Sequence, residues 1–533
     1  MDRLINRLIN TAIKHHNKTF IITEQRTWTY KEAWFQICSI SSLISSNYKS
    51  KFIPIFSDKS IFYYFSIVAV LLSGRAYVPL SPKDSNRNIK EKLKSLDVEI
   101  IISSNALFER INSICFDLDF IKDIILEQNK NDKTKNEKNL SLTSKNIIFY
   151  KYCQNTINTF DISKIKAKNN ITDYIYMIFT SGSTGNPKGI AIKSLNVTTY
   201  LDSVIEKFSY SSTDLHTQIF ELTFDLSVHD MMCAWTTGGG LVPIYGKAIF
   251  APQKIISKYQ ITCWFSVPAV GFIMQKSNGL KSSFLKSLRV SLFCGEPLPS
   301  SLADAWLNAS PGSILENLYG PTEATIAFTS HRFIPNLSKD SYLYGYVPIG
   351  LPFKGLKIAV MNENKISTSG ECKGELLLGG GQLFEGYWKN DELNKTALIQ
   401  FKKTGSQIWY RTGDIVVRNN NGIFYYVGRI DSQIKLNGYR VELGEVENAL
   451  RHASQSQLVA VVPWPLKDLN IIGITAIVSS TRYDDRFIMD KLKKLIPTYM
   501  LPQKILIWDL LPLNNSGKID KKSIIEKLKK DYL

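Results

Sequence analysis

The chain has 533 residues, of which 44% are hydrophobic and 21% are charged. This is ordinary globular composition, and the length excludes a single hydrophobic core because it corresponds to about three or four domain-sized units. The formal net charge is +18. Since the lysines are spread along the chain without a long basic block, we interpret this excess as a compositional bias rather than a nucleic-acid-binding surface.

The cysteines favour a reducing, cytoplasmic environment. Their number is odd, they are widely scattered, and no two of them form a C-x-x-C pair. This pattern argues against a disulfide framework and against a zinc site. The seven residues are Cys38, Cys115, Cys153, Cys233, Cys263, Cys294 and Cys372.

The first predicted element is an amphipathic helix within residues 1–14. MDRLINRLINTAIK places its apolar residues on one helical face and lacks the continuous apolar region of a signal peptide. The longest apolar run, IFYYFSIVAVLL at 61–72, is too short to span a bilayer. We therefore predict a buried helix at 61–72 and a soluble protein with no membrane insertion.

Further along the chain, strand-like apolar runs alternate with amphipathic stretches. The runs at 52–56, 76–80 and 98–103 are predicted to be buried strands around the 61–72 helix. Such alternation is typical of a parallel sheet covered by helices.

The rest of the chain predicts a second alternating region and a small separate domain. Alternation resumes at 174–328, after a polar segment at 128–146 that we interpret as a surface insertion. A strand-rich part follows at roughly 345–428. The last hundred or so residues alternate short strands with helices in an α+β pattern, so the sequence predicts a large domain at 1–430 and a small one at 431–533.

One glycine- and hydroxyl-rich stretch, FTSGSTGNPKGI at 179–190, follows an apolar strand. Backbone N–H groups and hydroxyls in such a turn can hold a phosphate chain, with lysine as counter-charge. Its spacing differs from the G-x-x-x-x-G-K-[ST] loop, because Pro187 precedes Lys188. Taken alone, the stretch is equally compatible with a phosphate clamp and a mobile linker.

Three further stretches carry polar residues on turns. Glu323 follows Gly-Pro-Thr in NLYGPTEAT and suits a Mg²⁺ ion that substrate phosphates also hold, although the turn could equally be a capped helix start. Asp414 in YRTGD could accept both hydroxyls of a ribose, or could be an ordinary turn residue. Lys518 in NNSGKID lies on a loop near the end of the sequence, where a lone lysine is usually solvent-facing.

Together these stretches resemble the adenylate-forming superfamily, and most closely its amino-acid adenylation branch. That branch includes the adenylation domains of nonribosomal peptide synthetases and the D-alanine–carrier protein ligases. The resemblance covers nearly the whole chain except 128–146. The matching motifs, in order, are WTYKEA, LLSGRAYVPL, TSGSTGNPKG, FDLSVHD, FCGEPLP, NLYGPTEAT, YRTGD, GRIDSQIKLNGYRVELGEVE and NNSGKID.

The resemblance implies an α/β fold and a two-step ligase reaction. The expected fold is a large domain of stacked α/β sheets with a β-rich subdomain, followed by a small mobile α+β domain. The expected reaction activates a carboxylic acid with ATP and Mg²⁺, releases pyrophosphate, and passes the acyl group to a thiol. Two anionic reactants must meet, so the site has to neutralise and position them.

The resemblance also implies an ATP site, whose residues we give by expected role. They are Thr180, Ser181, Gly182, Ser183, Thr184 and Lys188 at the β- and γ-phosphates; Asn317, Leu318, Tyr319, Gly320 and Pro321 at the adenine; Thr322 at the α-phosphate; Glu323 at Mg²⁺; Asp414 at the ribose with Arg429 nearby; and Tyr426 elsewhere in the site.

Lys518 is implied to be the catalytic lysine, which reaches the substrate carboxylate and the nucleotide while charge builds up at the α-phosphate. Because it belongs to the small domain, that domain must close for the first step. By resemblance it then rotates about Asp431, and the loop Gln433–Arg440 takes its place for thiol transfer. Gly438 is expected where a pantetheine arm passes.

The substrate is expected to be a small neutral amino acid. By resemblance, Asp225 in FDLSVHD binds the α-ammonium group; the alternative is that Asp225 or Ser227 merely caps a helix starting at Val228. His229 could bond a polar substrate, but a lone histidine is more often packed wall. The remaining wall is mostly apolar: Leu226, Phe265 or Ser266, Leu292, Cys294, Leu318, Ile326 and Ala327.

The partner is expected to be a separate phosphopantetheinylated carrier protein, because only thirteen residues follow Asp520. Three alternatives stay open: a D-alanine–carrier protein ligase, although His229 and Leu318 depart from that subfamily; an acyl- or aryl-coenzyme A synthetase, against which Asp225 argues; and a non-catalytic nucleotide- or nucleic-acid-binding protein.

Overall fold

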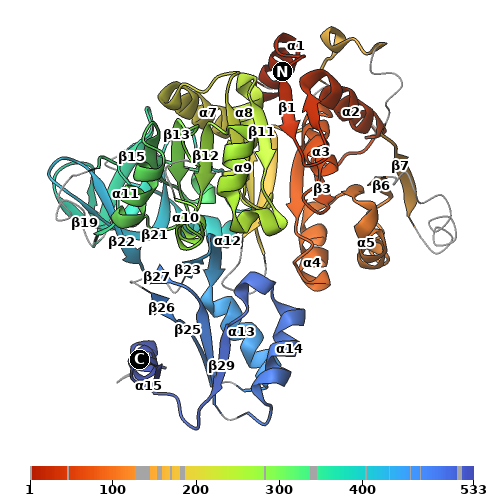
Figure 1. Cartoon of the computed structure of the whole chain (residues 1–533). Helices are drawn as coiled ribbons and strands as arrows, with labels where there is room; N and C mark the ends of the chain where they lie inside the picture. Colours follow the sequence, from red (N-terminus) through yellow and green to blue (C-terminus); the bar gives the residue numbers. More distant parts are fainter. Residues whose placement is uncertain are drawn as a thin grey trace. The chain divides into compact units, whose positions relative to one another are not determined.

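The computed structural model (Figure 1) consists of two compact units, which are described separately. The first comprises Met1–Ser81, Leu96–Ile178 and Gly189–Ile430; the second comprises Pro82–Ser95, Phe179–Lys188 and Asp431–Leu533. The residues that the structure describes are 3–44, 47–127, 145–152, 159–167, 171–180, 187–280, 284–335, 345–363, 365–401, 405–430, 433–456, 458–467, 470–479, 481–512 and 519–532.

A nine-stranded sheet forms one layer of the first unit. Its central strands are parallel, and β15, β16 and β2 join its two edges antiparallel. In spatial order the strands are β16 (Leu351–Pro352), β15 (Thr329–Arg332), β14 (Ile314–Tyr319), β13 (Val290–Phe293), β12 (Cys263–Ser266), β10 (Leu215–Gln218), β11 (Gly240–Pro243), β1 (Thr19–Ile22) and β2 (Thr27–Thr29).

A seven-stranded sheet forms a second layer, and parallel pairs link its strands from β7 to β8. In spatial order the strands are β7 (Asn146–Tyr150), β6 (Asp123–Glu127), β5 (Ile100–Ser103), β3 (Phe52–Phe56), β4 (Ala76–Leu80), β8 (Tyr174–Thr180) and β9 (Lys188–Lys193). The predicted strands at 52–56, 76–80 and 98–103 are confirmed, with β5 starting two residues later than predicted.

Helices connect the parallel strands, as the alternating pattern predicts. Helix α3 is buried on every side from Phe62 to Leu72, which explains its continuous apolar sequence, and Ser60 caps its N-terminus by accepting from the Tyr63 N–H. The helices are α1 (Arg3–Lys14), α2 (Tyr30–Leu43), α3 (Ile61–Leu72), α4 (Asn86–Leu96), α5 (Phe108–Cys115), α7 (Ser194–Phe208), α8 (Leu226–Thr237), α9 (Pro252–Tyr259), α10 (Pro268–Lys276) and α11 (Ser300–Ala309).

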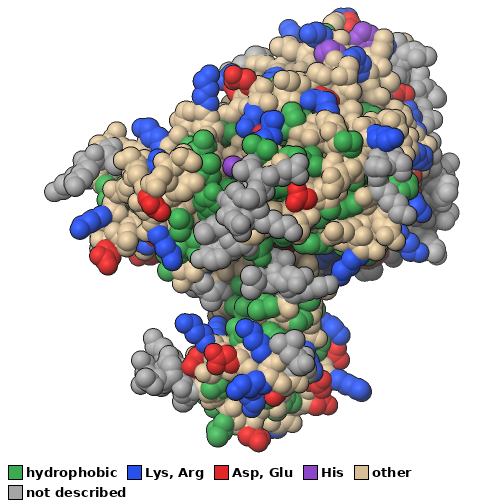
Figure 2. Space-filling view, turned by 60° about the vertical axis from the view of Figure 1, so that its left-hand side comes forward, with side chains coloured by type: hydrophobic (Ala, Val, Ile, Leu, Met, Phe, Trp, Pro, Cys, Tyr) green, Lys and Arg blue, Asp and Glu red, His purple; other side chains and the backbone are tan. Residues whose placement is uncertain are grey.

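Helix α1 packs against α7 and α8 with the apolar face that the sequence predicts. Leu4, Ile5, Leu8, Ile9 and Ala12 are buried. Among the described residues, no helix combines the length and the apolar content needed to cross a membrane. On the face seen in Figure 2, the Lys and Arg side chains are scattered among acidic and neutral residues, in line with a compositional origin of the net charge.

An antiparallel sheet completes the first unit and matches the strand-rich part of the sequence. Its elements are β17 (Lys357–Asn362), β18 (Lys365–Ser367), β19 (Cys372–Gly379), α12 (Asp391–Ala397), β20 (Leu398–Gln400), β21 (Ile408–Arg418) and β22 (Phe424–Arg429).

The second unit has its own apolar core between a three-stranded sheet and its helices. Its C-terminal elements are β23 (Gln433–Leu436), β24 (Tyr439–Glu442), α13 (Leu443–Ser454), β25 (Val459–Pro463), β26 (Leu466–Lys467), β27 (Asn470–Ile471), β28 (Ile474–Val478), α14 (Asp485–Leu495), β29 (Lys504–Ile507) and α15 (Lys521–Tyr532).

A two-residue turn joins β23 to β24 and contains Gly438. Asn437 has φ +51° and Gly438 has φ +83°, which are the positive values that a type I′ hairpin requires. Turn geometry alone therefore accounts for the Asn-Gly pair, and the pantetheine role of Gly438 stays a prediction.

Candidate active site

Asp225 stands directly before α8, and its carboxylate is buried, with 6% of the residue exposed. The helix begins at Leu226, two residues earlier than the sequence suggested, and the Asp225 side chain makes no capping hydrogen bond to it. Instead, Asp225 Oδ2 accepts a hydrogen bond of 3.2 Å from the backbone N–H of Ile326, 101 residues away. The capping alternative therefore does not explain this buried charge.

The segment that contacts Asp225 is a strained turn. Thr325 and Ile326 have φ values of +59° and +70°, and the Ala327 N–H donates to the Thr325 carbonyl at 2.9 Å, closing a γ-turn around Ile326. Two consecutive β-branched residues rarely adopt positive φ, because the branched Cβ meets the backbone. Such strain persists only where surrounding contacts hold it, and it is common at functional sites.

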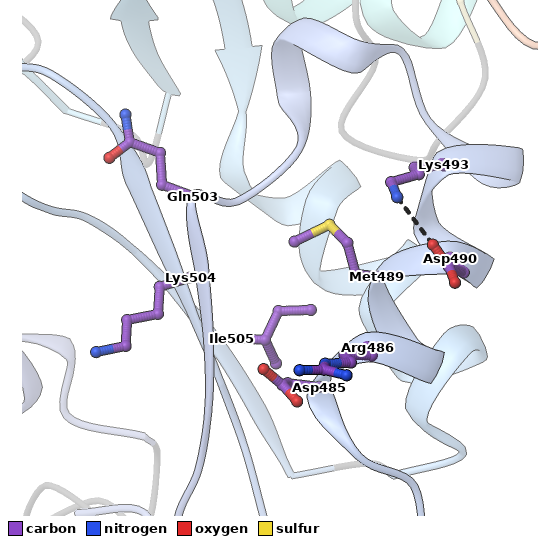
Figure 3. Close-up of a pocket in the computed structure, with 8 residues that line it drawn as sticks. All are labelled: Asp485, Arg486, Met489, Asp490, Lys493, Gln503, Lys504 and Ile505. Carbon is purple, nitrogen blue, oxygen red and sulfur yellow. Dashed lines mark hydrogen bonds and ion pairs between the residues drawn. The ribbon is translucent and has the colours of Figure 1, made fainter.

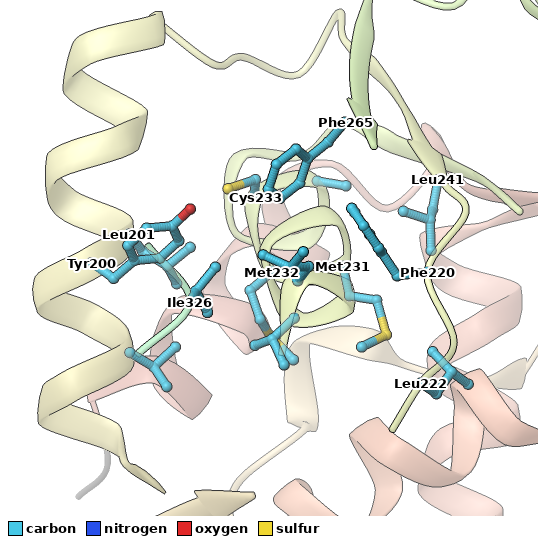
Figure 4. Packing of buried hydrophobic residues seen from close by; sticks show 14 of the residues in the cluster. Tyr200, Leu201, Phe220, Leu222, Met231, Met232, Cys233, Leu241, Phe265 and Ile326 are labelled. Carbon is cyan, nitrogen blue, oxygen red and sulfur yellow. The ribbon is translucent and has the colours of Figure 1, made fainter. Parts of the chain in front are cut away.

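The predicted pocket wall is buried around α8. Figure 4 shows Met231, Met232 and Cys233 of this helix packed among side chains of α7 and of the neighbouring strands, with Ile326 in the same cluster. Each predicted wall residue is buried: Leu226, His229, Phe265, Ser266, Leu292, Cys294, Leu318, Ile326 and Ala327. Within this set, the ionisable side chains are the His229 imidazole and the Cys294 thiol. The wall therefore offers no carboxylate or ammonium group to pair with a charged substrate side chain.

His229 is bound on both ring nitrogens by the protein itself. Its Nδ1 is 2.7 Å from the Tyr200 hydroxyl and its Nε2 is 3.4 Å from the Tyr210 hydroxyl. Burial, with a smaller effect of His216, lowers the pKa of His229 well below its usual range, so the ring is neutral. These contacts favour the interpretation of His229 as packed wall.

Two tyrosine hydroxyls near Asp225 were not predicted. Tyr77 on β4 and Tyr176 on β8 are paired in register and fully buried, and their hydroxyls have no hydrogen-bond partner among the described residues. Burial, and then the charge of Asp225, raises the pKa of both phenols. Both tyrosines lie in apolar stretches of the sequence, LLSGRAYVPL and YIYMIF. These apolar neighbours predict core residues and gave no indication of a role in the site.

Glu323 lies in a buried 3₁₀ turn, Thr322–Ala324, and is fully shielded from solvent. Its Oε1 accepts from the Tyr387 hydroxyl at 2.7 Å, and its backbone carbonyl accepts from the Phe384 N–H at 2.9 Å. A Cβ at Gly320 would lie only 2.6 Å from the Ala327 Cα, so the turn requires glycine there. Tyr387, in the EGYW stretch, is a second contact that the sequence did not reveal.

Asp414 is held by an ion pair and a phenol. Arg429 Nη1 lies 2.6 Å from Oδ1, and the Tyr319 hydroxyl donates to Oδ2 at 2.5 Å. Burial, followed by the Asp414 charge, raises the pKa of Tyr319 well above its usual range. Tyr426, on the β22 strand that also carries Arg429, is half-buried. The structure thus brings together Tyr319, Asp414 and Arg429, which the resemblance had placed in one ATP site.

Asn317 is buried on β14, the third strand from one edge of the nine-stranded sheet. Its Nδ2 donates to the carbonyls of Val347 and Pro348 at 3.0 and 2.9 Å. Its Oδ1 has no hydrogen-bond partner among the described residues. A buried acceptor of this kind suits an amine donor such as that of adenine.

Several predicted site residues lie outside the described ranges. Thr180 ends β8 and Lys188 begins β9, both half-buried, but the intervening Ser181, Gly182, Ser183 and Thr184 are not described. Asp431 and Lys518 are likewise outside the described residues, as is most of the 128–146 segment.

Two other features do not form part of this site. In the described residues, Asp214, His216 and Cys263 form a buried cluster of metal-ligand types, but Arg289, Thr262 and the Ser211 N–H already occupy the Asp214 oxygens. The Arg289 cation would repel a metal there, so we assign none. The pocket in Figure 3 is formed by α14 and the start of β29, pairs Lys493 with Asp490, and contains no predicted site residue.

Comparison with known proteins identifies the family. The protein-family model described as AMP-binding enzyme matches residues 9–388 of this chain. This chain belongs to that family. It is an AMP-forming ligase that uses ATP to adenylate its substrate, as the resemblance implied.

Similar proteins can be aligned with this chain over nearly its whole length. A D-alanine–D-alanyl carrier protein ligase of Listeria monocytogenes (serotype 4a) is 30% identical over 522 residues, which is 94% of each chain. The Vibrio cholerae adenylation domain AlmE, solved in complex with glycyl-adenosine-5′-phosphate, has a TM-score of 0.89 and 29% identity, covering 99% of this chain and 98% of its own. The amide bond synthetase McbA of Marinactinospora thermotolerans, at 17% identity and TM-score 0.81, covers 98% of both chains and shares the fold. The predicted fold class is therefore confirmed.

Proposed function

We propose that this ligase activates a small neutral amino acid as an aminoacyl adenylate, releases pyrophosphate, and transfers the aminoacyl group to the phosphopantetheine thiol of a separate carrier protein.

The observation that carries the substrate assignment is the buried carboxylate of Asp225. A buried carboxylate is costly unless a cation or several hydrogen-bond donors compensate it. Asp225 makes no capping bond to its helix and accepts a backbone N–H from a strained turn. A substrate α-ammonium would offer the Asp225 carboxylate a cation, whereas a fatty or aryl acid carries no ammonium group to place there.

The wall and the relatives both favour a small side chain. The buried, mostly apolar wall offers no charged partner to a substrate side chain. The relatives at about 30% identity carry the names of a D-alanine–carrier ligase and of an adenylation domain bound to a glycyl adenylate. We therefore rank glycine and D-alanine among the first substrates to test, together with L-alanine, serine and proline.

The residues of the first unit suit the nucleotide. Asp414, oriented by Arg429 and Tyr319, would accept the ribose hydroxyls. Asn317 Oδ1, for which the described part of the chain provides no hydrogen-bond donor, would accept from the adenine amine. Tyr319 would also flank the base with its ring, and Leu318, Gly320, Pro321 and Tyr426 would surround it.

The phosphates would be held from two sides. Thr180, Lys188 and the hydroxyl-rich residues between them would surround the β- and γ-phosphates, and Thr322 the α-phosphate. Glu323 fits a bound Mg²⁺, because it is a buried hard-oxygen ligand that accepts a hydrogen bond from the Tyr387 phenol. When bound, that ion would neutralise phosphate charge.

The small domain, 431–533 by our proposal, would supply the remaining chemistry. Lys518 would approach the substrate carboxylate and the α-phosphate during adenylation. Rotation about Asp431 would then replace it with the 433–440 hairpin, and Gly438 would leave room for the pantetheine arm. Carrier proteins are usually acidic, so the net charge of +18 would assist the encounter.

An exchange screen tests this function. Purified protein is incubated with ATP, Mg²⁺, labelled pyrophosphate and, one at a time, glycine and both enantiomers of the common amino acids. We expect label to enter ATP with one or a few small neutral amino acids, and a phosphopantetheinylated carrier then to gain the mass of that residue. Absence of exchange with every amino acid would refute the proposal.

The same screen separates the alternatives. Exchange confined to D-alanine would identify a D-alanine–carrier ligase, for which the relatives named above are the supporting observation. When fatty and aryl acids are added to the screen, exchange with one of them, followed by thioester formation on coenzyme A, would identify an acyl- or aryl-coenzyme A synthetase instead.

A further inference from the structure

Gln382 holds the strained turn that contacts Asp225. It follows β19, is fully buried, and its Nε2 lies 3.1, 3.2 and 2.8 Å from the carbonyl oxygens of Ala324, Thr325 and Ala327. The Thr325 hydroxyl returns a hydrogen bond of 2.6 Å to the Gln382 carbonyl. A glutamine amide is the appropriate group here, because only its nitrogen end can face several carbonyl oxygens without repulsion.

The position of Gln382 is itself fixed by α7. Asn196, which is 7% exposed, donates from Nδ2 to the carbonyls of Gly381 and Leu383 at 2.8 and 2.9 Å, one on each side of Gln382. Its Oδ1 in turn accepts from the Lys193 N–H at 3.0 Å. Buried hydrogen bonds thus form a continuous chain from α7 through this loop to the turn.

The last hydrogen bond of that chain reaches the Asp225 carboxylate. Positive φ at Thr325 and Ile326 directs the Ile326 N–H to Asp225 Oδ2 at 3.2 Å. A relaxed turn with ordinary φ would point this N–H elsewhere and remove the donor from Asp225. The backbone carbonyls that Gln382 binds belong to residues on both sides of Ile326, so it opposes this relaxation directly.

We propose that Gln382 is a positioning residue that sets the Asp225 carboxylate for the α-ammonium group of the substrate. It acts through the 324–327 turn and does not touch the substrate. The inference rests on the proposed amino-acid substrate, and its effect should therefore fall on the amino acid and not on ATP.

The test compares Gln382→Leu with the matched control Gln36→Leu. Gln36 is also a buried glutamine, 1% exposed, but it lies on α2 and accepts from the Tyr150 hydroxyl. Pyrophosphate exchange is measured with glycine against acetate and with D-alanine against propionate, so that each pair differs only in the amino group. For Gln382→Leu we expect the amino-acid KM to rise about tenfold or more, with the KM for ATP within about twofold.

Selectivity is the readout that a merely structural role would leave unchanged. We expect the kcat/KM ratio of amino acid to des-amino acid to fall about tenfold in Gln382→Leu and to stay at the wild-type value in Gln36→Leu. An unchanged ratio with an unchanged amino-acid KM would overturn the inference. No amino-acid exchange in the wild-type protein would overturn the proposed function as well, so the two failures are distinguishable.

A second variant covers the case in which Gln382→Leu does not fold. Gln382→Glu keeps the shape of the side chain but donates one hydrogen bond when protonated and none when ionised. Its amino-acid KM, relative to that of the wild type, should rise with pH between about pH 6 and pH 9, because burial places the titration of a carboxyl above its usual range. A ratio that stays at one throughout would overturn the inference.

Discussion

Asp225 should contribute to substrate binding chiefly through its charge. Asp225→Asn keeps an oxygen that can accept the Ile326 N–H but removes the negative charge. Losing one partner of a buried ion pair costs about 3–5 kcal/mol, so we expect the amino-acid KM in pyrophosphate exchange to rise roughly 100-fold or more. Steady-state exchange kinetics at several amino-acid concentrations measure this.

Asp230 provides a control for Asp225 on the same helix. It is also buried, at 1% exposure, and burial raises its pKa well above its usual range. Because this shift favours the protonated form and we assign Asp230 no contact with the substrate, the amino-acid KM of Asp230→Asn should stay near the wild-type value. Equal effects of the two substitutions would argue against a charge-based role for Asp225.

Lys518 should be needed for the adenylation chemistry and not for folding. Removing a group that stabilises developing charge costs about 2.7–4 kcal/mol, so Lys518→Ala should lower kcat for exchange by about 100-fold to 1,000-fold. The exposed Lys522 on α15 offers a matched control, since Lys522→Ala removes a cation nearby in the sequence. Undiminished exchange in Lys518→Ala, with unchanged thermal unfolding, would refute the assignment.

At the scale of elements, an ion pair and a hydrogen bond link the residues that precede three parallel strands. Asp214 precedes β10, Thr262 precedes β12 and Arg289 precedes β13. Burial by itself would raise the pKa of Asp214, but hydrogen bonds from Arg289, the Ser211 N–H and Thr262 outweigh it and lower the pKa to about 2. The folded carboxylate is therefore stabilised relative to the unfolded one.

This pKa shift predicts a pH-dependent stability difference. A lowered folded-state pKa contributes stability that is present above the unfolded value near 3.8 and is lost as pH falls towards about 2. Asp214→Asn should reduce the free energy of unfolding by about 2 kcal/mol at pH 7, and the difference from the wild type should shrink at pH 3. Urea unfolding of both proteins at the two pH values measures it.

A surface carboxylate offers the comparison. Asp202 pairs with Arg3 and Arg7 but its side chain is 42% exposed, so solvent screens the interaction. Asp202→Asn should change the free energy of unfolding by less than about 1 kcal/mol. If the Asp214→Asn difference were the same at pH 7 and pH 3, a role for its ionisation would be excluded.

The 380–387 loop supports two parts of the proposed site. The 380–387 loop contacts the turn through Gln382 and the Glu323 carboxylate through Tyr387. One loop therefore braces both carboxylates that we assign to the substrate and to Mg²⁺. From the sequence, this loop was predicted only to belong to the strand-rich part at roughly 345–428.

At the scale of the whole molecule, the proposal requires the small domain to adopt two arrangements. Asp431→Pro restricts φ at the proposed hinge, so rotation between the two steps should be impaired. We expect pyrophosphate exchange to remain measurable while aminoacyl transfer to the carrier thiol falls at least about tenfold. The ratio of the two rates in one preparation is the internal control, and equal losses in both would place the hinge elsewhere.

Much of the architecture was predictable because its signals are local. The α1 face and the buried α3 follow from apolar spacing within about 14 residues, and strands β3 and β4 from short apolar runs beside turns. The order of motifs was likewise sufficient to indicate the family. Element boundaries were predicted less accurately: α8 begins at Leu226 rather than at Val228, because the Asp225 backbone already has helical dihedral angles.

The site was predictable in its residue types but not in its contacts. The sequence pointed to Asp225, Glu323 and Asp414, yet their partners Ile326, Tyr387 and Tyr319 lie between 64 and 101 residues away. Periodicity and turn chemistry act over a few residues, whereas these pairs form only when sheets and loops pack together. Local sequence therefore decided which helices and strands form, and tertiary packing decided which buried charges meet a donor and which strained backbone is held in place.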